Sequence, residues 1–117
     1  MSTLRLTTIS NQTGSSSVPS ETVINGSAKA WVNFNGTGTV AIRASFNVSS
    51  ITDNGAGNYT VNFTTAFADA NYATQYMNDN GARYLWIDTV TSSSVKVYCF
   101  GPSAYFDTGI NCVSVFR

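Results

Sequence analysis

Apolar and polar residues alternate with a period of two along most of the chain from residue 28 onward. In the stretch KAWVNFN, Ala30, Val32 and Phe34 fall on one side of the chain, and Trp31 and Asn33 fall on the other. This alternation is typical of a half-buried β-strand, and turns that contain Asn-Gly or Gly separate such runs. The predicted strands are residues 29–35, 38–44, 59–63, 73–77, 83–90, 95–100 and 110–117.

Between the second and third of these strands, the stretch SFNVSSITD keeps Phe46 and Val48 in phase, whereas Ile51 follows one residue out of phase. That shift predicts a β-bulge or a strand end near residues 49–50. No segment has helical periodicity over two turns, and the Asp and Asn residues of 65–73 favour a loop there. We therefore expect an all-β fold, an antiparallel β-sandwich or a jelly-roll-like domain.

Residues 1–28 differ from the rest in composition. Leu4 and Leu6 lie on one side of an extended piece, and a Gly- and Ser-rich stretch with Pro19 follows. This pattern predicts an extended N-terminal arm and linker, followed by a β-sandwich domain at residues 29–117. The arm would either bind another molecule or dock its leucines on the chain's own core.

Charge excludes several classes of function. Charged residues make up only 10% of the chain, with six basic and six acidic side chains scattered along it. The basic residues form no cluster of the kind that would indicate a nucleic-acid partner.

The chain also has no apolar run of membrane-spanning or signal-peptide length. We therefore expect that it does not insert into a membrane and that it folds in a cytoplasm. A surface rich in Ser, Thr and Asn suits contact with sugars or with other copies of the chain.

Catalytic chemistry has little support in the sequence. The chain contains no histidine, which removes the commonest general base, and carboxylates such as Asp53 and Asp79 precede Asn-Gly turns. Two cysteines without histidine do not form a zinc site, and Asp53, Asn54 and Asn58 lack the spacing of a calcium loop. We therefore expect no enzyme activity, no catalytic residues, no metal and no cofactor.

Cys99 and Cys112 flank the segment GPSAYFDTG. If Phe100 paired with Asn111 across a hairpin, the two cysteines would face each other and a disulfide would be possible. Folding in a cytoplasm favours free thiols instead, so the sequence leaves both states open.

Aromatic residues are the strongest indication of a binding surface, at 13% of the chain. Tyr84 and Trp86 lie two residues apart on one strand face and would form a platform for a sugar ring. The alternative is that this face is a second core or a seam between subunits. Residues 101–109 would expose further aromatic residues at a hairpin tip. The candidate binding residues are Tyr84, Trp86, Tyr105, Phe106 and Asp107, and Trp31 and Tyr98 also lie opposite the apolar face.

Two segments resemble a known family. Residues 29–73, which begin KAWVNFNGTGTVAIRASFNVSSITDNG, closely resemble a segment that recurs in tail-fibre and other virion proteins of tailed bacteriophages. The opening STLRLTTISNQTG is similar to the start of the same proteins, with Leu4, Leu6, Ile9 and Gly14 in corresponding places. The resemblance ends after Tyr72.

The resemblance implies a virion appendage protein that is β-rich and often trimeric. Its N-terminal piece, here residues 1–28, would attach to other virion proteins, and its distal surface would meet a host glycan. The resemblance supplies no catalytic residues. We therefore expect a homotrimeric tail-fibre or spike-like protein located in the virion. The alternatives are a capsid decoration or head-fibre protein without an adhesive role, and a monomeric carbohydrate-binding module.

Overall fold

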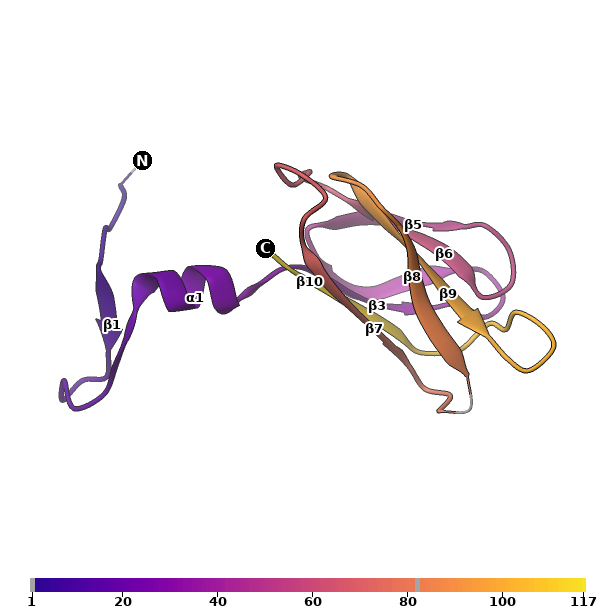
Figure 1. Ribbon diagram of the computed structural model, residues 1–117, viewed down its shortest axis with the longest axis horizontal. Helices are drawn as coiled ribbons and strands as arrows, with labels where there is room; N and C mark the ends of the chain where they lie inside the picture. Colours follow the sequence, from indigo (N-terminus) through magenta and orange to yellow (C-terminus); the bar gives the residue numbers. More distant parts are fainter. Residues whose placement is uncertain (1, 82) are drawn as a thin grey trace.

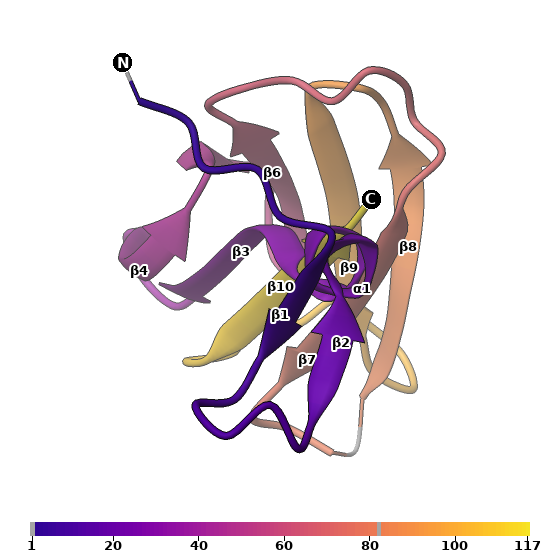
Figure 2. The same ribbon diagram turned by 90° about the vertical axis from the view of Figure 1, so that its left-hand side faces the viewer.

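A computed structural model describes residues 2–81 and 83–117. Most of the chain forms two four-stranded antiparallel sheets packed face to face (Figures 1 and 2). The first sheet has the order β4-β3-β10-β7 and the second β5-β6-β9-β8. The predicted all-β sandwich is therefore confirmed.

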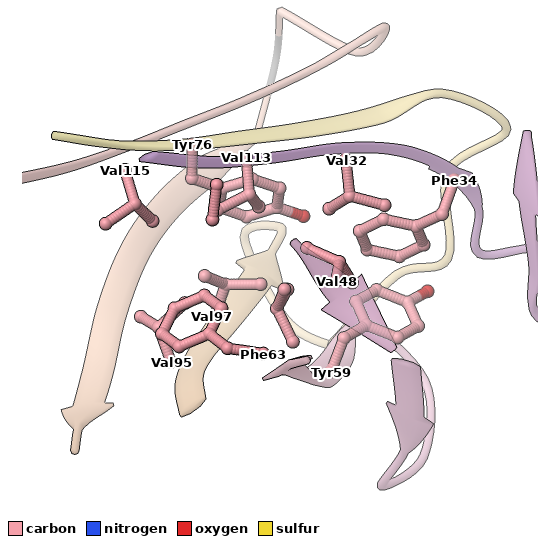
Figure 3. Packing of buried hydrophobic residues seen from close by; sticks show 12 residues of the cluster. Val32, Phe34, Val48, Tyr59, Phe63, Tyr76, Val95, Val97, Val113 and Val115 are labelled. Atoms are coloured by element: carbon pink, nitrogen blue, oxygen red, sulfur yellow. The ribbon is translucent and has the colours of Figure 1, made fainter. Parts of the chain in front are cut away.

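The alternation found in the sequence places the core between the sheets. In the first sheet, β3 (Ala28–Asn35) and β10 (Asn111–Phe116) occupy the centre, with β4 (Ala41–Phe46) and β7 (Ala73–Asn78) at the edges. In the second sheet, β6 (Asn58–Phe63) and β9 (Ser94–Phe100) are central, with β5 (Val48–Asp53) and β8 (Tyr84–Val90) at the edges. Side chains from both sheets meet in one cluster (Figure 3). The largest are Phe34, Tyr59, Phe63 and Tyr76, accompanied by valines of β3, β5, β6, β9 and β10.

The first hairpin differs from the sequence prediction in one detail. The second strand begins at Ala41 rather than at residue 38, because Asn35 organises the turn: its Oδ1 accepts hydrogen bonds from the Thr37 N–H and hydroxyl. Gly38, with φ +63°, completes that turn. The bulge near residues 49–50 is confirmed, since the β5–β6 register shifts between Val48 and Ser50.

Asn47 is the residue at which the chain crosses from β4 in the first sheet to β5 in the second. It has φ +55°, a left-handed conformation that asparagine tolerates better than most residues. Its amide donates to the carbonyls of Lys29 and Thr65, and its Oδ1 accepts from the Thr65 N–H. One side chain therefore fixes the crossing by joining three segments of the sandwich.

Residues 2–27 project from the sandwich along the long axis of the molecule (Figure 1). This segment, called the arm below, contains β1 (Thr8–Ser10) paired with β2 (Ser17–Pro19) and the helix α1 (Ser20–Gly26). The arm gives the chain a radius of gyration of 17.1 Å, above the value of about 13 Å for a compact domain of this size. Met1, the first residue of the predicted arm, lies outside the described residues.

The helix was not predicted, although its ends carry recognisable signals. Pro19 precedes its first turn, Glu21 lies in that turn and Gly26 ends it. The Lys29 ammonium donates to the carbonyls of Ile24 and Ser27 at the carboxyl end. Its seven residues are too few to show a helical period over two turns, so the hydrophobic pattern could not reveal it.

Candidate functional site

The outer face of the β5-β6-β9-β8 sheet carries a group of aromatic side chains. Residues that alternate with the buried Val95, Val97 and Cys99 point outward from β9, and their partners on β8 lie beside them. The register pairs Trp86 with Tyr98 and Tyr84 with Phe100.

Tyr105 completes this group from the loop between β9 and β10. Its ring centroid lies 4.9 Å from that of Phe100, 5.5 Å from Tyr98 and 6.4 Å from Trp86. The Trp86 and Tyr98 rings are 5.4 Å apart and tilted by 32°. We call Tyr84, Trp86, Tyr98, Phe100 and Tyr105 the aromatic patch. Apart from Tyr84, its rings are preorganised by contact with one another, and the side chains remain accessible.

Three of the five predicted binding residues belong to the patch. Tyr84 is 64% exposed, Tyr105 45% and Trp86 38%. The other two, Phe106 and Asp107, have a different place. The Phe106 ring packs against Gly101 and lies under the Arg83 guanidinium, whose carbon is 3.9 Å from the ring centroid.

Asp107 fastens the loop to the sandwich. Its Oδ1 accepts a hydrogen bond of 2.5 Å from the Tyr59 hydroxyl and one of 2.9 Å from the Gly57 N–H. Burial, followed by the hydrogen bond to Asp107 and its charge, raises the pKa of the Tyr59 hydroxyl well above the usual value. Tyr59 therefore remains a donor to this carboxylate. The Asp107 carboxylate is therefore engaged in hydrogen bonds that hold the loop against the sandwich.

The far end of the same loop is held by a buried asparagine. The Asn111 Oδ1 accepts hydrogen bonds from the hydroxyls of Tyr76 (2.7 Å) and Thr108 (2.8 Å), and its amide donates to the Thr108 carbonyl. A buried amide with satisfied groups on both sides rigidifies its surroundings. The loop that carries Tyr105 is therefore anchored at two points.

Tyr98 and Phe100 are patch residues that the sequence prediction did not include among the binding residues. The signal was present, since both alternate with buried residues on β9, as Tyr84 and Trp86 alternate with the half-buried Leu85 on β8. What the sequence lacked was the β8–β9 register, which brings the two pairs together.

Polar side chains cover the other half of this sheet face. Asn62 donates from its amide to the hydroxyls of Ser50 (3.1 Å) and Thr52 (2.9 Å) on β5. The Asn54 amide donates to the Thr60 hydroxyl at 2.9 Å. We call Ser50, Thr52, Asn54, Thr60 and Asn62 the polar ladder. These bonds hold the side chains in place and leave the Asn62 carbonyl oxygen and the Thr60 hydroxyl proton available to a ligand.

Lys96 lies between the two halves of the face, opposite Thr60 on β6. Its ammonium is 5.2 Å from the centre of the Tyr98 ring, within the range of a cation–π contact. The Tyr98 side chain, with a smaller influence from Asp88, raises the pKa of Lys96. The face is therefore aromatic at one side and polar but uncharged at the other, and the Lys96 ammonium lies between the two sides.

The pairing of Phe100 with Asn111, on which a disulfide would depend, is not present. Phe100 pairs with Tyr84, whereas Asn111 pairs with Phe34 and Asn78 in the other sheet. Both edges of β9 are occupied by β6 and β8, and both edges of β10 by β3 and β7, so the two strands cannot form a hairpin.

The two cysteines are therefore separated by their sheets. Cys99 is buried and Cys112 is exposed, and both are free thiols. Burial raises the pKa of the Cys99 thiol, and the Asn78 amide donates to its sulfur at 3.1 Å. The disulfide that the sequence left open is not formed in this structure.

Over residues 2–81 and 83–117, no cluster of three or more His, Cys, Asp or Glu side chains is arranged to hold a metal ion. In the same ranges, no helix has the length and apolar character needed to span a membrane.

Comparisons with known proteins do not identify the chain. No protein-family model matches it, and searches of curated proteins and of solved structures returned no match either.

Proposed function

We propose that the protein is a virion appendage protein of a tailed bacteriophage, tail-fibre or spike-like, whose outer β5-β6-β9-β8 face binds a glycan of the host surface. The aromatic patch is the observation that carries this proposal. Sugar rings have faces of C–H groups that stack on aromatic rings, and hydroxyl groups at their edges that need hydrogen-bond partners. The patch supplies the first kind of contact and the polar ladder supplies the second.

The position of the patch is consistent with this role. The loop that carries Tyr105 lies at the end of the sandwich away from the arm (Figure 1). A protein attached to a particle through residues at the arm end would present this loop outward. The resemblance of residues 29–73 to phage virion proteins supports the same proposal. Because many such appendages are trimers, the proposal includes a trimeric assembly.

Two tryptophan variants provide a matched test. Trp86 (38% exposed) lies in the patch, and Trp31 (41% exposed) lies on the outer face of the opposite sheet. We expect Trp86→Ala to weaken binding to an array of immobilised bacterial surface oligosaccharides by about tenfold or more, equivalent to about 1.4 kcal/mol. Trp31→Ala should bind as the wild type does. Absence of wild-type binding, or equal losses in both variants, would contradict the proposal.

A second candidate is a capsid decoration or head-fibre protein without an adhesive role. The outer face of the first sheet favours it, because Trp31, Phe46 and Met77 are exposed there and would suit a flat protein lattice. In that case Trp31→Ala would reduce occupancy on the particle, and Trp86→Ala would change neither occupancy nor adsorption to cells. Counting the protein on purified particles that carry each variant distinguishes the two candidates.

A further inference from the structure

We propose that the arm is a self-association element, in which a groove between its extended segment and helix α1 receives the arm of a second copy of this chain. The proposal depends on the arm alone and is independent of glycan binding.

The arm encloses an open groove of about 400 Å³. One wall is the extended segment before and within β1, and the other is the helix. The side chains that line it are mostly aliphatic and exposed, with exposed fractions from 42% to 82%. They are Leu4, Leu6, Ile9, Val23 and Ile24.

The arm's own contacts are too few to stabilise this arrangement. β1 and β2 have three residues each, and isolated two-stranded hairpins are marginal in water. Helix α1 has seven residues, whereas isolated helices shorter than about 12–15 residues are marginal. None of its seven residues is buried, all of them being described, and its N-cap makes no side-chain hydrogen bond. The arm therefore needs another surface to cover its aliphatic side chains.

The rest of the same chain does not supply that surface. The groove lies on the part of the molecule that projects beyond the sandwich (Figure 1). An intermolecular contact is therefore the way to bury this groove.

The composition of the groove favours a second copy as the occupant. Each arm carries both the groove and aliphatic side chains able to fill it, which is the requirement for a self-complementary interface. The charged side chains that line the groove are Arg5 and Glu21, one of each sign, and they are also the only charged residues between 2 and 27. Two arms therefore meet without net repulsion and with the possibility of an Arg5–Glu21 pair at the rim. The groove has no net charge that would attract a strongly charged partner.

The test measures the mass of the full-length protein by sedimentation equilibrium over a range of concentrations. We expect the wild type to form an assembly of two or more chains. Leu6→Asp and Ile24→Asp place a charge on opposite walls of the groove and should each reduce the mass to one chain. Ser15→Asp adds the same charge on the exposed β1–β2 turn and should retain the wild-type mass.

Each result bears directly on the proposal. Fluorescence of Trp31 and Trp86 verifies that the sandwich of each variant is folded. A wild type that is monomeric at every concentration would overturn the proposal and leave the groove to another protein. An assembly that withstands both Leu6→Asp and Ile24→Asp would also overturn it, because association would then reside in the sandwich.

Discussion

The arm and the sandwich both contain aliphatic side chains, but only the sandwich buries them. Both have β-branched and aliphatic side chains in alternation with polar ones. In the sandwich Val32, Val97 and Val115 are at most 2% exposed, whereas in the arm Val18 and Val23 are 40% and 43% exposed. Alternation therefore marks the apolar side of a segment, and only the surrounding structure determines whether that side is covered.

The largest expected effect comes from the covered side of this comparison. Phe34 is fully buried and makes an edge-to-face contact with Tyr59 at 5.1 Å. We expect Phe34→Ala to lower the free energy of unfolding by about 3–5 kcal/mol, because it leaves a cavity in a packed core. Urea denaturation followed by tryptophan fluorescence measures the change.

Leu6→Ala in the arm is the control for this experiment. Leu6 is 50% exposed, and its truncation should change the unfolding of the sandwich by less than about 0.5 kcal/mol. If Leu6→Ala cost as much as Phe34→Ala, the arm would be part of the sandwich's cooperative unit, and the contrast between the two regions would be wrong.

The strands show what alternation can predict. It located the buried side chains of β3 and β6 correctly, with Ala30, Val32 and Phe34 inside and Trp31 outside. It also placed Tyr84 and Trp86 together on an outer face. Such information is local, because a strand's two faces follow from its own sequence.

Alternation does not reveal partners that are distant in sequence. The Asp107 carboxylate accepts a hydrogen bond from Tyr59, 48 positions away. Phe100 and Asn111 flank one loop, yet each pairs with a strand that the loop does not connect. The direction of a loop side chain is set by the surface onto which the loop folds, and that surface cannot be read from the loop itself.

A smaller effect tests how tightly the loop is packed against the sandwich. Gly57 has φ +59°, and a Cβ there would lie 2.3 Å from the Cys99 carbonyl oxygen and 2.8 Å from the Phe106 nitrogen. We expect Gly57→Ala to cost about 1–2 kcal/mol for the left-handed backbone and about 1–3 kcal/mol more for the crowding. Gly38→Ala is the matched control, since Gly38 has φ +63° and no atom within 4 Å of the added Cβ. Urea denaturation of both variants gives the difference, and equal losses would show that the loop yields without cost.

The smallest expected effect is a decrease in the free energy of unfolding of the sandwich at alkaline pH, which the arm should not show. Tyr72 donates from its hydroxyl to the carbonyls of Thr91 (2.8 Å) and Ser94 (2.9 Å). Burial raises the pKa of this hydroxyl from 10.0 to about 12, and burial likewise raises the pKa of Tyr59 and Tyr76. The folded chain therefore holds these protons more tightly than the unfolded chain does.

The sign of the effect follows from this difference. Below about pH 10 both states keep the tyrosine protons, so the free energy of unfolding contains the full contribution. Above pH 10 the unfolded chain loses them first, and the free energy of unfolding should fall as the pH rises towards 12. Urea midpoints at pH 8 to 11 measure the slope, which Tyr72→Phe should make shallower.

An unchanged slope in Tyr72→Phe would show that the folded chain does not hold this proton. The arm, whose side chains include neither tyrosine nor lysine between residues 2 and 27, provides the other half of the comparison. If arms associate as proposed, the mass of the assembly should stay constant from pH 8 to 10.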